Sequence, residues 1–306
     1  MHWLVKVASL KALSAIPGGT RLYRFGQEKL TRSLVPTRER VEQKIGVGND
    51  YLKWLKDNDR ATTLLAGTHL DFGSGWHPTI PLLYYSMGVE RQFLVDVKPL
   101  MDLKMAVETA RIFRETVEGL QMPHTSKLRP LPQVRSGAVL SDFLESMGIN
   151  YWAPYESHLA QVANKVDVVT CTQVLYYLPR QFLSCCFQQI NTVLRIGGIF
   201  MATLRLTTPD FAGLSDYAHL GFSPWVWDHL INSPILSYNR LKAPDYRLSL
   251  EQAGFRVVHF KTNPPEDSDF VRLKEIGLHP TFAGYPLEDL VTRHLFIVAE
   301  KVKHVN

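Results

Sequence analysis

Short apolar runs alternate with helix-like stretches along most of this 306-residue chain, and this alternation constrains the fold more than any other feature. The runs that we interpret as strands are Thr68–Phe72, Gln92–Val95, Ile149–Trp152, Val166–Thr170, Gly198–Leu204, Phe255–Lys261 and His294–Val302. The stretches that we interpret as helices include Thr79–Met87, Leu100–Val117 and Gln181–Leu194. Strands that alternate with helices of this length form βαβ units, whose right-handed crossovers place parallel strands side by side. The sequence therefore predicts an α/β fold with a doubly wound, mostly parallel sheet.

Two segments depart from this alternation. Residues 1–60 have a helical pattern with breaks at 16–19 and 46–48, and we interpret them as a lid or packing arm. Residues 207–245 are rich in Pro, Trp and Asn, and we predict that they form one insertion on the substrate side. The predicted domains are a helical N-terminal segment, 1–60, and an α/β domain, 61–306, that carries the insertion.

The composition is that of a folded globular protein, with 45% hydrophobic and 21% charged residues, and it excludes intrinsic disorder. No apolar run approaches the ~18 residues of a membrane-spanning helix, so we expect no stable membrane insertion. Lys and Arg total 34 against 29 for Asp and Glu, and the excess lies entirely in residues 1–35. Because the rest of the chain is balanced and shows no basic stripe, we do not expect a nucleic-acid partner.

The chain has three cysteines, Cys171, Cys185 and Cys186. An odd number with two adjacent members is not a disulfide framework, and no Cys or His spacing is typical of a zinc site. We therefore expect a reducing, cytoplasmic setting and no metal.

A Gly-x-Gly turn after the first predicted strand carries most of the chemical information. Asp71 ends the strand, Gly73 and Gly75 form the turn, and Pro78 lies where a helix would begin. Glycines allow a sharp turn and the close approach of a ligand, and Pro suits the first helical turn because its missing N–H would be unpaired there. The N–H groups at a helix N-terminus attract carboxylates and phosphates. The motif therefore predicts a ligand site.

The residues around the turn limit what the ligand can be. A dinucleotide-binding fingerprint would require a third glycine at the position of Pro78. The carboxylate of Asp71 suits a cationic ammonium group, and Asp96, 21 residues after Gly75 at the end of the next strand, suits both hydroxyls of a ribose. The predicted ligand thus combines an amino acid with a ribose and has no pyrophosphate, as S-adenosylmethionine (SAM) does.

With these motifs the chain resembles the class I SAM-dependent methyltransferases, of the bacterial small-molecule, secondary-metabolite or saccharide type. The matching segments are Leu70–Gly75 for the first motif, Asp96 for the ribose position, Val166–Cys171 for the fourth strand, and Ile190–Gly198 for the approach to the fifth. The resemblance implies a Rossmann-like sheet with an antiparallel final strand, formed by His294–Val302 beside Phe255–Lys261. The polar–apolar alternation of His294–Val302 also predicts that this run is an edge strand.

The resemblance implies SAM as the cofactor and assigns the residues that bind it. These are Asp71, Gly73, Ser74, Gly75, Asp96, Val97, Glu156, Thr172 and Gln173. Glu156, in the loop after the third strand, is predicted to accept the amino group of adenine, and Asp142 is a rival for that role.

Acceptor residues are expected at the carboxyl ends of the strands. Many relatives carry a Glu-His pair after the fourth strand, where this chain has Tyr176 and Tyr177, so no base can be carried over from that position. We predict that His77 and Tyr177 are catalytic, His77 because a histidine suits base chemistry near neutral pH. The predicted substrate residues are Tyr176, Arg205, Asp210, His219 and Arg240. Arg21, Arg24 and Arg32 of the N-terminal arm are expected to meet an anionic substrate. The expected role of Trp225 and Trp227 is core or lid packing.

The function implied is a biosynthetic methyltransferase that acts on a small-molecule acceptor, with a hydroxyl or carboxyl oxygen as the first choice. Nitrogen and sulfur acceptors stay open, because a tyrosine pair suits a pocket in which a cation develops. A module that binds SAM without transferring its methyl group is the non-enzymatic alternative. The sequence leaves a homodimer open.

Overall fold

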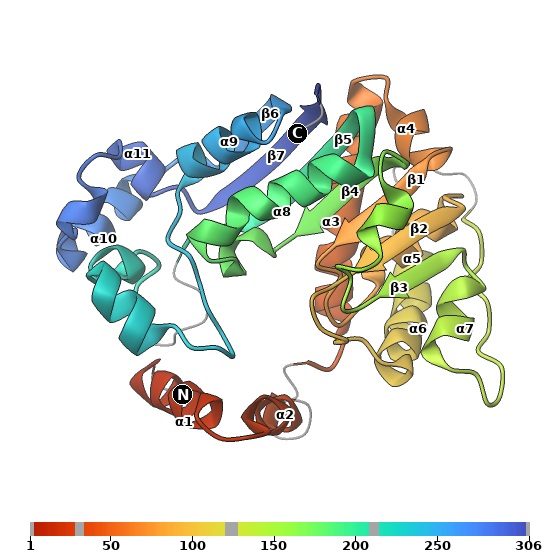
Figure 1. Cartoon of the computed structure of the whole chain (residues 1–306), viewed down its shortest axis with the longest axis horizontal. Coiled ribbons are helices and arrows are strands. Elements are labelled where there is room, and N and C mark those ends of the chain that lie inside the picture. The colour runs from red at the N-terminus through yellow and green to blue at the C-terminus, as the bar shows by residue number, and fades with distance from the viewer. Residues whose placement is uncertain (1–2, 28–33, 120–127, 208–213, 304–306) are drawn as a thin grey trace.

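A seven-stranded sheet forms the centre of the molecule, with the strand order β3-β2-β1-β4-β5-β7-β6 (Figure 1). This computed structural model describes residues 3–27, 34–119, 128–207 and 214–303. The strands are β1 Thr68–Phe72, β2 Arg91–Val95, β3 Ile149–Trp152, β4 Val166–Thr172, β5 Leu194–Arg205, β6 Phe255–Thr262 and β7 His294–Lys301. Strands β1 to β5 are parallel, whereas β7 is antiparallel to both of its neighbours, β5 and β6. The Rossmann-like, mostly parallel α/β sheet with an antiparallel final strand is therefore confirmed.

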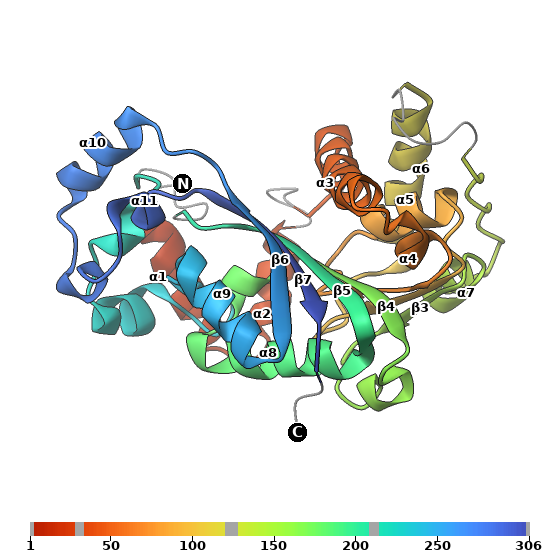
Figure 2. The same ribbon diagram turned by 90° about the horizontal axis from the view of Figure 1, so that it is seen from above.

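Helices cover both faces of this sheet, as Figure 2 shows from above. One face is covered by α3 Arg38–Asp57, α5 Thr79–Ser86 and α6 Leu103–Gly119, with the short helices α4 Ala61–Leu65 and α7 Leu140–Glu145 near them. The other face is covered by α8 Arg180–Val193 and α9 Ala243–Gln252. Because both faces are covered, the central strands are largely buried, and all five residues of β1 are buried, including the polar Thr68, His69 and Asp71.

Helix α3 corrects the expected break at residues 46–48. It runs without interruption from Arg38 to Asp57, and its N-terminus is capped by the Thr37 hydroxyl, which accepts from the Arg40 N–H. A Cβ at Gly48 would lie 2.7 Å from Leu83 of α5, so this glycine permits close packing of two helices. The buried face of α3 thus packs on α5 and α6 and shares their apolar cluster.

Strand β7 corrects the expected edge strand. It lies between β5 and β6, and seven of its eight residues are at least partly buried, whereas β6 occupies the edge. The polar residues at the end of β7 suggested an exposed edge strand, but their charges are paired inside the protein. Glu300 pairs with Arg60 at 3.2 Å, and the Lys301 amine donates to three oxygens, one each on Asn164, Asn191 and Leu194.

Two insertions, and not one, follow β5. The first contains the short helices η4 Ala218–Leu220 and η5 Val226–Ile231 and ends where α9 begins. The second, between β6 and β7, contains α10 Asp267–Ile276, η6 Pro280–Phe282 and α11 Leu287–Leu290. The two share a small apolar core that is separate from the sheet, formed by Tyr217, Leu220, Leu273, Phe282, Leu290 and Val291.

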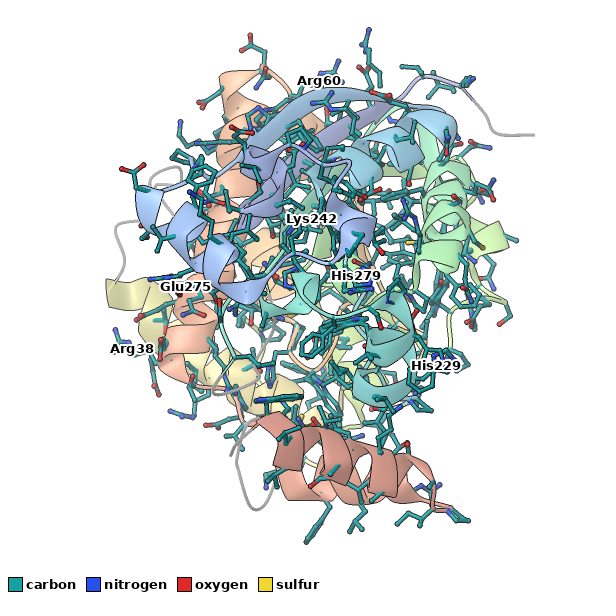
Figure 3. The ribbon with its side chains drawn as sticks, turned by 90° about the vertical axis from the view of Figure 1, so that its left-hand side faces the viewer. Arg38, Arg60, His229, Lys242, Glu275 and His279 are labelled. Atoms are coloured by element: carbon teal, nitrogen blue, oxygen red, sulfur yellow. The ribbon has the colours of Figure 1, made fainter. Side chains whose placement is uncertain are left out.

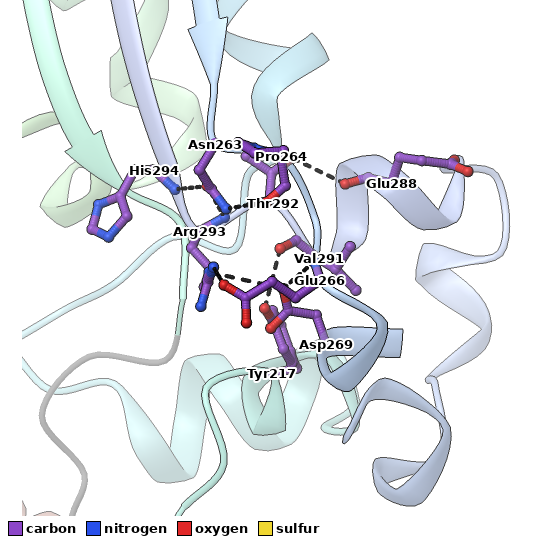
Figure 4. Close-up of polar contacts among 10 residues, drawn as sticks. All are labelled: Tyr217, Asn263, Pro264, Glu266, Asp269, Glu288, Val291, Thr292, Arg293 and His294. Atoms are coloured by element: carbon purple, nitrogen blue, oxygen red, sulfur yellow. Dashed lines mark hydrogen bonds and ion pairs between the residues drawn. The ribbon is translucent and has the colours of Figure 1, made fainter. Parts of the chain in front are cut away.

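Polar contacts tie the second insertion to the start of β7 (Figure 4). The amide oxygen of Asn263 accepts from the backbone N–H groups of Arg293 and His294 at 2.9 and 2.8 Å. The Tyr217 hydroxyl of the first insertion donates to the Val291 carbonyl at 3.1 Å. These contacts hold both insertions beside the carboxyl end of β5.

The N-terminal arm consists of α1 Trp3–Ser14 and α2 Gly19–Phe25, so the predicted break at 16–19 is confirmed. Helix α1 packs on the first insertion, where Trp3 lies 6.0 Å from Phe222 between ring centroids. The Lys11 amine also donates to the carbonyl of His229, at 2.7 Å. Figure 3 shows the labelled His229 near α1, the red helix. The arm is therefore attached to the first insertion. We call α1 and the two insertions the acceptor side, because the acceptor is predicted to lie there.

Three expectations about chemistry and location can be compared with the described residues. The three cysteines are free. Within the described ranges, no group of three or more His, Cys, Asp or Glu side chains is arranged to hold a metal ion. None of the helices in those ranges has the length and apolar character needed to cross a membrane.

Candidate functional site

The Gly-x-Gly turn lies where the carboxyl ends of β1 and β2 meet. Gly73 and Gly75 have φ values of 77° and 67°, which L-residues with a side chain rarely adopt. The N–H groups of Gly73 and Ser74 both donate to the Val95 carbonyl at the end of β2, at 2.9 and 3.1 Å. The turn is thereby held against β2 by backbone hydrogen bonds.

Two carboxylates flank this turn on neighbouring strands. Asp71 and Asp96 are 6% and 7% exposed, and burial raises the pKa of both. Asp96 accepts from the Gly75 N–H at 3.0 Å and from the Lys98 N–H at 3.3 Å, which orients its carboxylate toward the turn. The pairing of β1 with β2 fixes the spacing of the two acids, because Asp71 is opposite Leu94 in the register.

The groups around the turn fit a ligand with amino and hydroxyl groups. The Ser74 hydroxyl is buried and has no hydrogen-bond partner among the described residues, and the same holds for Thr79 at the start of α5. A Cβ at Gly75 would meet only the Gly73 carbonyl oxygen, at 4.0 Å, so there is open space beside the bare backbone. Val97, next to Asp96, is 53% exposed and offers an apolar surface. The roles of these residues in cofactor binding stay predictions.

Lys44 of α3 belongs to this site and was missed by the sequence analysis. Its charge acts on both Asp71 and His77, and burial lowers its own pKa. Because residues 1–60 were treated as a separate arm, a lysine in this segment was not considered. The helical spacing in the sequence does indicate its position, since Lys44 lies on the helical face that also carries the buried Val41, Ile45 and Gly48.

His77 and Trp76 connect the turn to the N-terminal segment. His77 Nε2 donates to the Leu34 carbonyl at 2.8 Å, and burial, with the nearby charge of Lys44, lowers the pKa of His77 to about 4. The Arg24 guanidinium of α2 lies 4.6 Å from the Trp76 ring centroid and pairs with Asp102 at 3.1 Å. The N-terminal segment thus contacts the cofactor turn directly. Arg32, which was predicted to meet substrate, lies outside the described residues.

Thr172 and Gln173, at the end of β4, contact other parts of the protein. The Thr172 hydroxyl lies 3.1 Å from the Tyr51 hydroxyl, which also contacts Thr203 at 3.0 Å. Gln173 has a φ of 60°, and its side-chain oxygen accepts from the Arg205 N–H at 3.2 Å. These two residues therefore link the ends of β4 and β5, and their predicted role in cofactor binding stays a prediction.

The loop after β3 contains the predicted adenine residue. Glu156 is exposed, four residues beyond the end of β3, and its loop is close to Trp152, whose ring stacks on His158 with 5.2 Å between centroids. The rival, Asp142, accepts from the Val139 N–H at 3.1 Å and so caps helix α7. This contact leaves Glu156 as the acid with the freer carboxylate.

A narrow cavity on the acceptor side brings together four of the five predicted substrate residues. Tyr176, Arg205, His219 and Arg240 all line it, together with Leu206, Thr207, Trp227, Tyr238, Asn239 and Leu241. The fifth, Asp210, lies outside the described residues.

The polar groups of this cavity are mostly engaged. Arg240 donates to the His219 carbonyl at 3.1 Å, and its guanidinium lies 5.4 Å from the Trp227 ring centroid. His219 is 3% exposed, and burial holds its pKa well below the ordinary value. Arg205 donates to the Thr207 hydroxyl at 2.6 Å. Arg240 and His219 therefore hold the first insertion in shape as well as lining the cavity.

Three tyrosines form the side of the acceptor region next to β4. The Tyr176 and Tyr177 hydroxyls lie 3.0 Å apart, and the rings have 4.2 Å between centroids. Tyr238 of the first insertion lies 5.2 Å from Tyr177, measured between ring centroids. Trp227 packs as predicted, with its N–H donated to the Tyr238 carbonyl at 2.8 Å, whereas Trp225 is 61% exposed.

No protein-family model and no curated protein matches this sequence. Solved structures with a similar arrangement include an S-adenosylmethionine-dependent methyltransferase from Mesorhizobium loti (13% identity, TM-score 0.41, covering 81% of this chain and 97% of that one). Another is a SAM-dependent methyltransferase from Methanosarcina mazei (13% identity, TM-score 0.42, covering 77% of this chain and 92% of that one). A third is geranyl diphosphate C-methyltransferase from Streptomyces coelicolor (11% identity, TM-score 0.40, covering 83% of this chain and 78% of that one). At these identities and TM-scores, none of these similarities identifies the reaction or the acceptor of this chain.

Proposed function

We propose that this protein is a SAM-dependent methyltransferase that acts on a small-molecule acceptor. One observation carries the proposal: two buried carboxylates, Asp71 and Asp96, flank a Gly-x-Gly turn that contains the buried Ser74 hydroxyl, which no described residue hydrogen-bonds. A ligand that offers an ammonium group and vicinal hydroxyls satisfies all three groups together.

The residues present assign the parts of the cofactor. Asp71 binds the ammonium group, Asp96 the ribose hydroxyls, and Val97 one face of the adenine. Lys44, a cation beside Asp71, binds the cofactor carboxylate, and Glu156 accepts from the adenine amino group. When bound, the cofactor supplies a methyl group on a sulfonium, which an acceptor lone pair attacks in line.

On the acceptor side, the chain aligns the acceptor and excludes water. Tyr176, Tyr177 and Arg205 stand at the ends of β4 and β5, where an acceptor next to the cofactor must lie. With its Nε2–H donated to Leu34 and a pKa of about 4, His77 is neutral and a weak base near pH 7. Its contact with Leu34 supports a positioning role alongside the predicted catalytic one.

A nitrogen acceptor is the second candidate, and the three tyrosines favour it. Their rings lie together beside the cavity, and aromatic faces stabilise a cation such as the ammonium that forms when an amine is methylated. A matched panel of hydroxyl, carboxyl and amine acceptors, with S-adenosylhomocysteine (SAH) formation as the readout, distinguishes the two classes. Cofactor binding with no SAH formed from any acceptor would favour the non-catalytic module.

Binding of SAH, measured by calorimetry, tests the cofactor site. Asp96→Asn should weaken SAH binding by about 100-fold, because the ribose hydroxyls lose a charged acceptor. Asp57→Asn, the same change in an exposed ion pair with Lys53, is the control and should leave the affinity within about twofold. Equal affinities of the Asp96 variant and the unaltered protein would contradict the assignment.

The role of His77 needs a separate test. If His77 is the base, His77→Ala should lower turnover by ~10²–10⁴ and leave SAH affinity unchanged. If it only positions Leu34, the same variant should weaken SAH binding and lower turnover by less than tenfold. Steady-state turnover and calorimetry on the same protein decide between the two roles.

A further inference from the structure

A chain of buried polar side chains runs beneath the Gly-x-Gly turn. His69 and Asp71 are two residues apart on β1, so their side chains point to the same face of the sheet. On that face, β2 places Gln92 beside His69 and β4 places Thr170 beside Asp71. Three contacts connect them: Gln92 Oε1 with His69 Nδ1 at 2.9 Å, His69 Nε2 with Thr170 Oγ1 at 2.8 Å, and Thr170 Oγ1 with Asp71 Oδ1 at 2.8 Å.

Gln92, at the end of this series farthest from Asp71, fixes the direction of the hydrogen bonds. Gln92 Nε2 donates to the Pro81 carbonyl at 2.9 Å, so the oxygen of the Gln92 amide faces His69. An amide oxygen only accepts, and His69 Nδ1 must therefore carry a proton. In a neutral imidazole, His69 Nε2 is then an acceptor.

Counting protons shows that one is missing. The three contacts need three protons, but a neutral imidazole, a hydroxyl and a carboxylate supply two. Thr170 would face two acceptors, His69 Nε2 and Asp71 Oδ1, with one hydroxyl proton. All of these groups are buried, and a buried acceptor pair without a proton between its members is unfavourable. One further proton, on Asp71 or on His69, completes the chain, and in both cases the pair is electrically neutral.

The surroundings decide where this proton lies in the absence of a ligand. Burial raises the pKa of Asp71 to about 6 and lowers that of His69 to about 4, which places the proton on Asp71. Of the charged groups facing Asp71, Lys44 of α3 lowers its pKa and Asp96, directly after β2, raises it. The remaining titratable groups near it stay neutral because burial raises the pKa of each: Tyr51 and Tyr84 on the helices, and Cys171 on β4.

We propose that Thr170 and His69 form a proton relay for Asp71, which moves the shared proton from Asp71 to His69 when the ammonium group of the cofactor arrives. The relay rests on the proposed function, because that ammonium is the cation that stabilises the Asp71 carboxylate. The proton of Asp71 passes to Thr170 Oγ1, and the hydroxyl proton of Thr170 passes to His69 Nε2. Thr170 then donates to the carboxylate, and the imidazolium donates to Thr170. No proton leaves the protein and no hydrogen bond is lost, so His69 and Thr170 are positioning residues.

Nitrogen-15 NMR of the full chain, labelled at histidine, tests the relay with SAH as the probe. At about pH 5, where Asp71 of the free protein holds its proton and His69 is neutral, the His69 Nε2 signal should change from an unprotonated to a protonated nitrogen as SAH saturates the protein. His69→Gln assigns the signal by its loss. If SAH binds and His69 stays neutral, or if His69 is already an imidazolium in the free protein, the relay is wrong. If SAH does not bind, the proposed function itself fails.

Proton counting by calorimetry, in two buffers of different ionisation enthalpy, gives an independent test. At about pH 5, where Asp71 is mostly protonated, the unaltered protein should exchange close to zero protons when it binds SAH. Thr170→Val and His69→Gln cannot pass the proton on, so each should release about one proton, and its SAH affinity should fall about tenfold per pH unit below pH ~6. His259→Gln, a matched change on the edge strand β6, should behave like the unaltered protein. Release of one proton by the unaltered protein would overturn the relay, and the NMR result decides if a variant does not fold.

Discussion

The cofactor edge and the acceptor side of this molecule are held together in different ways. At the cofactor edge, backbone hydrogen bonds set the register of β1 and β2 from Thr68 opposite Arg91 to Phe72 opposite Val95. On the acceptor side, α1 and the two insertions meet mainly through side chains, in two small apolar clusters apart from the sheet. We infer that a backbone change harms the first region most, whereas loss of a large side chain harms the second.

The largest effect is expected at Gly73. Gly73→Ala imposes a side chain at a φ of 77°, with its Cβ 2.5 Å from a methyl group of Val174. We expect SAH affinity to fall by ~100-fold or more and the free energy of unfolding to fall by ~2–4 kcal/mol. Calorimetry and urea denaturation measure these quantities. Gly46→Ala, where an added Cβ meets nothing within 4 Å on α3, is the control and should not weaken binding.

On the acceptor side, Trp227→Ala should show that the two regions respond independently. The Trp227 side chain is 1% exposed and fills the cluster between α1 and the first insertion, so its loss should destabilise that cluster by ~3–5 kcal/mol. Hydrogen exchange in residues 214–242 should accelerate while SAH affinity stays within about threefold. A similar response from the exposed Trp225→Ala, or a collapse of SAH binding, would show that the regions are not independent.

The buried Lys242 predicts a pH dependence of stability on the acceptor side. Burial lowers its pKa from 10.5 to about 7, so between these values the unfolded chain binds more protons and the folded protein gains stability as pH rises. Lys242→Met removes this term and should raise the free energy of unfolding by ~2–4 kcal/mol at pH ~6, with the difference vanishing near pH ~10.5. Urea denaturation across this range checks it. A constant difference at every pH would point to packing alone.

The smallest effect is expected where the two regions meet. Arg24→Ala removes the cation–π contact with Trp76 and the partly exposed pair with Asp102, together worth ~0.5–1 kcal/mol. SAH affinity should fall by about two- to fivefold. Arg21→Ala, an exposed change on the same helix, is the matched control. Equal responses of the two variants would mean that α2 has no specific contact with the cofactor turn.

The strands were the most predictable elements, since both predicted bounds match the structure for β1 and β3. Apolar runs between turn residues mark buried strands, whatever their neighbours are. The order of the last two strands could not be predicted in the same way. Partners that are distant in the sequence satisfy the charges of Glu300 and Lys301, and the local pattern does not contain these partners.

In the candidate site, too, residues set by local sequence features were predictable and residues set by tertiary packing were not. Asp71, Gly73, Gly75 and Asp96 were predictable because the turn and the strand ends are local features that parallel pairing brings to one edge. Lys44 and the contact between His77 and Leu34 were not, because they depend on where α3 and the preceding segment pack.

By itself, the sequence determined the α/β class, the strands and the acidic Gly-x-Gly turn, because each follows from local periodicity or from the backbone freedom of glycine. Only the tertiary structure decided that α3 belongs to the core, that two insertions share one cluster, and which atoms face Asp71. Those facts depend on packing and hydrogen bonds between residues that are distant in the sequence, such as His69 and Thr170, which are 101 positions apart. The proton shared by Asp71 and His69 is a consequence of these contacts, because it follows only from counting donors and acceptors across three strands.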